Sequence, residues 1–497
     1  MEIYSLSFFL LVSVGLILYY TVFSRCQWIC LLGLSLLFFT ASGWKGLVFL
    51  LFTALTIWLG GLQLAKLDAD SAARRKAPGI SKDEKKAIKA QAVRRKKCLV
   101  AAVLTANFLV LGYFKYWSYF AELLSGAFSA TAPSSLGLVM PLGISFYTFS
   151  AGGYLIDVYR GTVAPERSLL TFGTYLTMFP KLVSGPIASY AQLQPEFGTR
   201  DVSLRQAVDG LKLFVFGMAF KILLANQLGG LWSDVTTIGF ESLSTPLAWM
   251  AAFAYSFQLY FDFWGYSLMA IGIGRMLGFH LPENFRQPFF SASVKELWAR
   301  WHISLSQWFR DYVYIPLGGN RKGIARRDAN LLLTFLVSGL WHGANWTFLV
   351  WGGLHGLCQV AEDHMPAPLR KRKSLPLRIV GVPLTFAIFV TTFTIFRASS
   401  LGNAAAYFAG ILHNPGHEVF AQYWLLGLTS KLELLLLLLG IALLVLVDVL
   451  HECGLHLRAW VNAAPRPVRW AVYEFAIFAF LLMASFYSNT GFLYARF

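Results

Sequence analysis

The sequence is poor in charge, and above all in acidic residues. Only 13% of its 497 residues are charged and 57% are hydrophobic, and 25 acidic residues face 42 lysines and arginines. A soluble domain has about twice this proportion of charged residues. The composition therefore excludes an ordinary soluble protein. It predicts an all-α, polytopic membrane protein in which residues 1–497 form a single membrane domain.

Cysteine pairs and the common catalytic motifs are missing too. The five cysteines are scattered and form no Cys-x-x-Cys, so neither a disulfide framework nor a zinc site is predicted. The sequence has no Gly-x-Ser-x-Gly elbow, no phosphate-binding loop and no acidic cluster for a divalent cation. We therefore expect no metal and no bound cofactor.

The formal net charge of +17 does not predict nucleic-acid binding, because the basic residues lie in short connectors between apolar spans. Residues 66–97 hold twelve Lys and Arg against four Asp and Glu and are predicted to form a basic cytoplasmic loop. That orientation places both termini outside. The positive-inside rule explains the excess of basic residues in this segment, so no specific anionic partner is needed.

The hydropathy pattern predicts about ten full crossings and two or three segments that dip into the bilayer. The connector 125–139 is uncharged, as an external loop can be. Residues 169–187, interrupted by Pro180 and Pro186, and residues 331–360 have basic flanks on both sides, which favours re-entrant segments over crossings. The predicted crossings are 4–23, 28–40, 45–64, 99–124, 140–159, 213–228, 247–277, 380–396, 432–450 and 471–487.

The histidine that the sequence singles out is His342, within an apolar run. His342 stands between Trp341 and Trp346 in residues 331–360, where there is no charged residue. An imidazole in hydrocarbon costs several kcal/mol unless a partner or a water-lined cavity receives it. His342 is thus either a functional residue or a histidine satisfied by packing. Gly343 and the pair at 352–353 are expected break points of a helical hairpin.

A second histidine lies in residues 293–311, which are too polar to span a bilayer. Ser293 and Glu296 have the spacing of a capping box, so a helix is predicted to begin there. Its tryptophans recur every three or four residues, which is typical of a helix anchored in the membrane interface. His302 and Ser306 are expected to share one face of that helix.

The two histidines together suggest proton transfer. A neutral imidazole can accept a proton from a hydroxyl group and return it to a leaving group, as acyl transfer requires. It can equally relay protons in a channel or a transporter, which is the main alternative at this point.

Six ordered motifs occur between residues 140 and 356. They are Pro141-Leu-Gly143-Ile-Ser145, Phe179-Pro-Lys181-Leu-Val-Ser-Gly185-Pro186, Tyr260-Phe-Asp262-Phe-Trp-Gly265, Pro282-Glu-Asn284-Phe-Arg286, Trp301-His302 through Gly318-Gly319-Asn320, and Gly339-Leu-Trp341-His342-Gly343. These motifs resemble those of the membrane-bound O-acyltransferase family, and we take the region that holds them as the catalytic core. Within the family they are most similar to the bacterial alginate O-acetyltransferase membrane subunits, and more distantly to the D-alanyl transfer proteins of teichoic acid synthesis.

The resemblance implies a ring of tilted helices with a central funnel, and a site in which His342 is catalytic and His302 is its second histidine. Residues that flank the histidines are predicted to bind substrate: Trp298, Ser306, Trp341 and Asn345.

The implied function is transfer of an acetyl group from a cytoplasmic thioester, acetyl-CoA, across the bacterial inner membrane for O-acetylation of an exported polysaccharide. The implied partners are an external SGNH-type acyltransferase or a small membrane peptide, together with the lipid bilayer. The alternatives are D-alanyl transfer to a cell-wall polymer, transport of an acyl donor or lipid-linked sugar, and an inactive scaffold.

Overall fold

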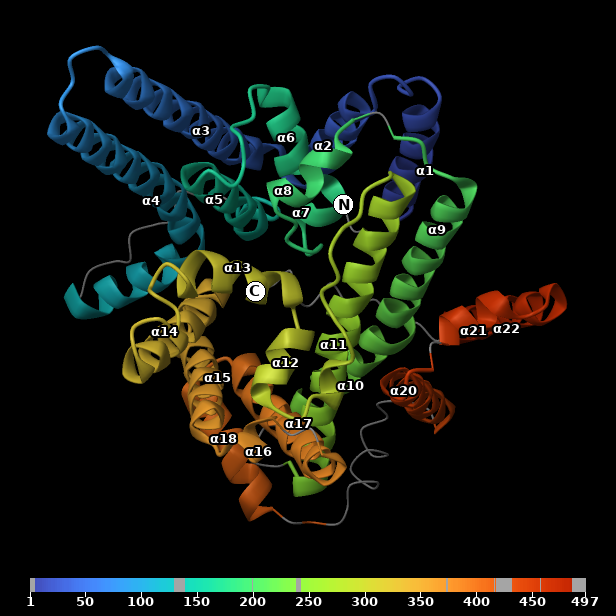
Figure 1. Ribbon diagram of the computed structural model, residues 1–497. Helices are drawn as coiled ribbons and strands as arrows, with labels where there is room; N and C mark the ends of the chain where they lie inside the picture. The colour runs from blue at the N-terminus through green and yellow to red at the C-terminus, as the bar shows by residue number, and fades with distance from the viewer. Residues whose placement is uncertain are drawn as a thin grey trace. The chain divides into compact units, whose positions relative to one another are not determined.

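Every regular element that the computed structural model describes is a helix (Figure 1), which confirms the all-α class. The structure describes residues 5–128, 139–198, 200–237, 243–371, 374–414, 416, 431–455 and 457–484. Parts of two predicted segments therefore lie outside the described residues. They are residues 129–138 of the connector 125–139 and residues 485–487 of the last predicted crossing.

The chain divides into two compact units. The first comprises Met1–Lys212 with Ala270–Pro282, and the second Leu213–Met269 with Glu283–Phe497. Both predicted histidine sites belong to the second unit. The helices of the first unit are α1 (Leu6–Tyr20), α2 (Gln27–Gly43), α3 (Leu47–Lys76), α4 (Lys82–Phe128), α5 (Ile144–Arg160), α6 (Leu169–Thr177), α7 (Phe179–Leu182) and α8 (Tyr190–Leu193).

Two long helices, α9 (Leu204–Ala219) and α11 (Thr245–Met276), contribute residues to both units. A π-helical segment, Phe220–Ala225, follows α9 directly. The remaining helices of the second unit are α10 (Asn226–Thr237), α12 (Val294–Arg300), α13 (Ile303–Phe309), α14 (Ile324–His342), α15 (Trp346–His364), α16 (Ala367–Lys371), α17 (Leu375–Arg397), α18 (Leu401–His413), α20 (Lys431–Glu452), α21 (Leu457–Ala463) and α22 (Arg466–Ala484).

Three helical stretches of the described chain are long and apolar enough to cross a membrane: Gln27–Lys76, Lys82–Trp117 and Leu375–Arg397. Leu6–Tyr20 and Leu401–Leu412 are apolar but shorter. The chain is therefore a membrane protein, as its composition predicts. The count of about ten crossings stays a prediction.

The basic segment 66–97 is a helical hairpin, so the prediction of a loop is wrong. Helix α3 runs on to Lys76 and α4 begins at Lys82, and the two helices lie side by side (Figure 1). The segment is rich in Ala, Lys and Arg, which are strong helix formers. Ser81 and Glu84 cap α4 reciprocally, and Lys96 pairs with Asp68 across the hairpin at 2.7 Å.

The predicted break in residues 169–187 is confirmed. Helix α6 ends at Thr177, and the four-residue α7 follows from Phe179 with Pro180 in its first turn. Gly143 has a left-handed φ of 66°, and a Cβ atom there would overlap the carbonyl oxygen of Leu182. Only glycine fits this contact.

The central run forms the predicted hairpin. Helix α14 ends at His342, and α15 begins at Trp346, so Gly343 is the break point. Gly352 is not a break point, because it lies within α15 and serves the packing of the two helices. A Cβ atom at Gly352 would overlap the carbonyl oxygen of Phe335, and one at Gly339 would overlap that of Phe348. The two glycines thus allow α14 and α15 to approach closely along their length.

Candidate functional site

His302 lies at a break between two short helices, not on one continuous helix. The predicted start is correct, because the Ser293 side chain accepts a hydrogen bond from the backbone of Glu296 at 3.0 Å. Helix α12 nevertheless ends at Arg300, and His302 adopts a left-handed φ of 45° before α13. Ser306 belongs to α13, so the expectation that His302 and Ser306 share one helical face is wrong.

The segment around Asn284 holds this break in place. The backbone carbonyl of Asn284 accepts a hydrogen bond from Ile303 N at 3.0 Å, and its side-chain oxygen accepts one from the Ser304 hydroxyl at 2.6 Å. The Asn284 amide nitrogen donates to the Ser267 hydroxyl at 3.0 Å. Asn284 is itself buried. These bonds stabilise a strained left-handed residue that an uninterrupted helix would not contain.

The His302 side chain is 2% exposed and meets the Phe263 ring edge to face at 4.6 Å. Burial lowers the pKa of His302, so its imidazole is neutral at pH 7. The neighbouring tryptophans are also inside the protein, since Trp301 is 3% and Trp308 8% exposed. The predicted interfacial anchor is therefore wrong, because these rings pack on other aromatic side chains, Trp301 on Phe389 at 5.0 Å among them.

His342 is the last residue of α14 and is 6% exposed. Aromatic rings surround it: its centroid lies 4.8 Å from Trp341, 5.3 Å from Trp351 and 5.0 Å from Phe396. The break at Gly343 ends the helix, so His342 lies at a helix C-terminus. The last backbone carbonyl groups of a helix have no hydrogen-bond partner within it.

The two histidines line one small cavity. Its volume is about 10 Å³, which is room for about one water molecule. His302 comes from the break before α13 and His342 from the end of α14, so the fold brings together two side chains that are distant in sequence. The lining residues are Leu259, Trp298, Trp301, His302, Leu305, His342, Trp351, Phe393 and Phe396.

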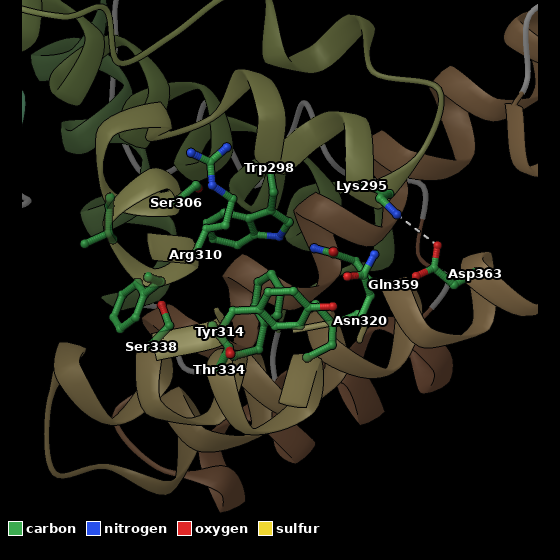
Figure 2. Close-up of a pocket in the computed structure, with 14 residues that line it drawn as sticks. Lys295, Trp298, Ser306, Arg310, Tyr314, Asn320, Thr334, Ser338, Gln359 and Asp363 are labelled. Carbon is green, nitrogen blue, oxygen red and sulfur yellow. Dashed lines mark hydrogen bonds and ion pairs between the residues drawn. The ribbon is translucent and has the colours of Figure 1, made fainter. Parts of the chain in front are cut away.

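A larger pocket of about 370 Å³ shares Trp298 and Leu305 with the small cavity. Figure 2 shows its polar side chains and marks the ion pair between Lys295 and Asp363. The Lys295 Nζ atom lies 2.9 Å from Asp363 Oδ1. The amide nitrogen of Gln359 is buried in the wall without a hydrogen-bond partner among the described residues. The polar lining residues are Lys295, Ser306, Arg310, Tyr314, Asn320, Thr334, Ser338, Gln359 and Asp363.

A third histidine, His355 on α15, was not predicted from the sequence. It is fully buried, accepts a hydrogen bond from the Trp298 indole N–H at Nδ1 (3.3 Å), and lies 3.1 Å through Nε2 from the Thr392 hydroxyl. Because Thr392 donates to the carbonyl of Ile388 at 2.7 Å, Nε2 of His355 carries the proton. His355 is thus a neutral residue that orients Trp298, one of the two side chains that line both the pocket and the cavity.

The predicted substrate-binding residues fall into two groups. Trp298 and Ser306 line the 370 Å³ pocket. Asn345 instead caps α15, accepting from Thr347 N at 3.1 Å and donating to the Ser399 carbonyl at 2.8 Å. Trp341 packs on the His342 ring, and neither it nor Asn345 lines the pocket or the cavity. Substrate binding by these four residues stays a prediction.

The arrangement has the parts that acyl transfer requires. A neutral imidazole can take the proton of an attacking hydroxyl, and an adjoining pocket can hold the donor with its reactive carbon near that imidazole. Among the described residues, no group of three or more His, Cys, Asp or Glu side chains is arranged to hold a metal ion.

Comparison with known proteins places these features in a family. The sequence profile of the membrane-bound O-acyltransferase family matches residues 163–401. The chain is 40% identical to a probable alginate O-acetylase AlgI of Pseudomonas putida over 61% of this chain and 62% of that one. The corresponding Pseudomonas aeruginosa protein is 37% identical over 79% of this chain and 71% of its own length.

A Helicobacter pylori peptidoglycan O-acetyltransferase is 34% identical over 62% of this chain and 63% of its own. The match thus spans less than two thirds of some relatives and more than two thirds of the P. aeruginosa protein. Together with the paired histidines and the broken helices that present them, these matches establish that the chain belongs to the membrane-bound O-acyltransferase family.

Proposed function

We propose that this protein transfers an acetyl group from acetyl-CoA on the cytoplasmic side for O-acetylation of an exported polysaccharide. The observation that carries the proposal is the cavity that His302 and His342 line together, next to a pocket large enough for part of a thioester donor. Relatives named for the O-acetylation of alginate and of peptidoglycan support a polysaccharide as the final acceptor.

The 370 Å³ pocket is the proposed donor site. Lys295 and Arg310 are 62% and 61% exposed at its edge, where cationic side chains attract the phosphates of acetyl-CoA. Deeper in the wall, the unpartnered amide of Gln359 can donate a hydrogen bond to an amide carbonyl of the donor's pantetheine arm. The pocket therefore offers charge at its edge and hydrogen bonds within.

The size of the histidine cavity favours a short acyl group. Tryptophan and phenylalanine rings surround a free volume of about 10 Å³. A close-packed aromatic wall resists the extra methylenes of a long acyl chain, since inserting them requires side chains to leave their preferred rotamers. An acetyl group needs the least rearrangement.

In the proposed reaction, His342 accepts the proton of the acceptor hydroxyl as its oxygen attacks the thioester carbonyl carbon. A carbon–oxygen bond forms, the carbon–sulfur bond breaks, and the thiolate takes the proton back from the imidazolium. The products are an O-acetyl ester and the free thiol of coenzyme A. His302, across the cavity, orients the hydroxyl or relays its proton.

The proposed location is the bacterial cytoplasmic membrane, with both termini outside and the basic hairpin of α3 and α4 in the cytoplasm. An acetyl group that emerges outside needs a further acceptor, which we propose to be an SGNH-type acyltransferase or a small membrane peptide. Acetyl-CoA is a substrate in this scheme, and no bound cofactor is required.

Membranes containing the protein and radiolabelled acetyl-CoA test the proposal. His342→Ala and His302→Ala are each expected to lower acetyl transfer about 10²–10⁴-fold, as loss of a general acid–base does. His364→Ala is the matched control, because His364 is 52% exposed and pairs with Asp328 away from the cavity. Unchanged transfer by His342→Ala would refute the proposed role.

The same membranes separate the alternatives. A D-alanyl transferase would use an aminoacyl thioester in place of acetyl-CoA. A transporter would move the intact labelled donor into vesicles without releasing free thiol. An inactive scaffold would support polymer acetylation in the double histidine variant.

A further inference from the structure

Two charged side chains are buried against each other in predicted crossings that are otherwise almost uncharged. Lys221 is the only Asp, Glu, Lys or Arg in residues 213–233, and Asp262 is the only one in residues 242–274. Lys221 Nζ lies 2.5 Å from Asp262 Oδ1, and the two side chains are 3% and 1% exposed. Ionisable side chains within a membrane segment are costly, so they indicate a function by default.

Stability alone does not explain a buried ion pair. Both charges must be removed from water, so two apolar side chains of similar volume often stabilise a fold as well or better. The best-attested use of buried polar groups between helices is to fix register, since the two groups must meet. The elements that Lys221 and Asp262 join therefore show what the pair fixes.

Lys221 belongs to the π-helical segment Phe220–Ala225, a rare conformation that is frequent at functional sites. The segment packs on α11, where the Phe220 ring stacks on Trp264 at 4.6 Å. Just before it, Gly217 approaches α11 so closely that a Cβ atom there would overlap the carbonyl oxygen of Gly265. A contact between two glycines brings helices together without interlocking side chains, so the ion pair is left to fix their register.

Three residues of α11, each four apart, support the histidine site and so share one face of the helix. The Phe263 ring meets the His302 ring edge to face at 4.6 Å. The other two are Leu259, which lines the histidine cavity, and Ser267, which accepts a hydrogen bond from the Asn284 amide. The ion pair lies on a different face, so α11 is held between the π-helical segment and the turn that carries His302.

We propose that Lys221 and Asp262 are positioning residues, and that their ion pair fixes the register of α11 and thereby places Phe263 against the imidazole of His302. Neither residue lines the histidine cavity or the 370 Å³ pocket, so they act through α11 and not on substrate. The effect on turnover rests on the proposed function, because the role of His302 does. The placement of the His302 ring does not.

Nuclear magnetic resonance tests the placement without any substrate. The full-length protein in phosphatidylcholine nanodiscs carries ¹³C-labelled histidine, and the His302 signal is the one of nine that His302→Gln removes. The double variant Lys221→Met with Asp262→Leu replaces both charges by apolar side chains of similar size. We expect it to unfold near the wild-type temperature and to show a shifted His302 signal, because the ring in contact with that imidazole has moved.

Kinetics with acetyl-CoA test the consequence. The double variant should lower kcat about ten-fold or more, since a displacement of about 1 Å at a positioned group costs about 10²-fold. KM should stay within about two-fold, because no residue of α11 lines the 370 Å³ pocket. Asp262→Glu keeps both charges and adds one methylene, so it should fold and show smaller changes in the same two measurements.

Lys96→Met with Asp68→Asn removes a more exposed ion pair, in the hairpin of α3 and α4, and should leave the signal and the kinetics unchanged. A folded double variant with its His302 signal at the wild-type position would overturn the proposal, and so would a shifted signal with wild-type kcat. If the double variant does not fold, Asp262→Glu decides by the same criteria. A wild type that transfers no acetyl group would refute the proposed function, while the spectra would still test the placement of His302.

Discussion

Replacing His355 with alanine is expected to lower both stability and turnover, although His355 lines neither the histidine cavity nor the 370 Å³ pocket proposed to bind the donor. The change removes the hydrogen-bond partner of the half-buried indole N–H of Trp298 and one partner of the Thr392 hydroxyl. It also removes an aromatic ring that is 5.2 Å from Trp351 and 5.9 Å from Phe393. The Trp298 ring, which no longer has this hydrogen bond, is then held only by its packing on rings such as Phe335 and Trp351, and we expect it to turn between the 370 Å³ pocket and the cavity.

The magnitude follows from these contacts. Truncation of a fully buried ring, with a half-buried donor left unpaired, destabilises a protein by about 3–5 kcal/mol. A displacement of about 1 Å at a group that positions substrate costs about 10²-fold in rate. Trp298→Phe removes the indole N–H but keeps most of the ring, so we expect a smaller loss of about 1–3 kcal/mol.

The assay compares acetyl-CoA kinetics and thermal unfolding for His355→Ala, Trp298→Phe and the double variant, with His364→Ala on the same helix as control. Both single changes break the same hydrogen bond, between Trp298 and His355. The double variant should therefore lose less free energy of unfolding than the sum of the two single losses, by about 0.5–3 kcal/mol. If His355→Ala lowers the unfolding temperature but keeps kcat and KM within two-fold of wild type, His355 is structural only and the positioning argument is refuted.

Three further changes test other parts of the account. Gly339→Leu should prevent α14 and α15 from packing closely, since even a Cβ overlaps the Phe348 carbonyl, and little folded protein should be recovered by size-exclusion chromatography; normal yield would contradict the packing. Gln359→Leu should raise KM for acetyl-CoA about ten-fold with kcat little changed, because it removes a donor from the pocket wall; an unchanged KM would exclude it from the donor site. Asn284→Ala should lower kcat about ten-fold or more in protein that remains folded, since it frees the turn that holds His302; wild-type kcat would show that the turn is held by other contacts.

Much of the fold could be predicted from the sequence because hydropathy and glycine spacing act locally. The apolar spans, the break at Pro180 and the hairpin around Gly343 follow from such patterns. The prediction of a loop at 66–97 is wrong because it uses charge alone, and charge indicates only that the segment is solvated. The alanine, lysine and arginine residues of the segment also favour helix, so α3 and α4 extend beyond the apolar spans. Gly352 looked like a breaker but serves the approach of two helices.

The site could be predicted only in part. His342 stands out because imidazole is rare in an apolar run, and His302 because the motif around it resembles that of the family. The break that turns His302 into the cavity depends on Asn284, a contact that no local pattern reveals. His355 lies in the same apolar run as His342, and the sequence does not distinguish a catalytic imidazole from one that positions a neighbour. The role of His355 follows only from its hydrogen bond with Trp298. The spacing of the tryptophans in residues 293–311 predicts a membrane interface, because such spacing does not distinguish a helix face on lipid from one in a protein core.

A structure of the protein with a non-hydrolysable acetyl-CoA analogue bound would test the central claim most directly. We predict that the pantetheine arm occupies the 370 Å³ pocket, passes Trp298, and places the acetyl carbonyl in the cavity between His302 and His342. An analogue bound elsewhere, or with its acetyl group separated from both imidazoles by an unmoved Trp298, would contradict the account.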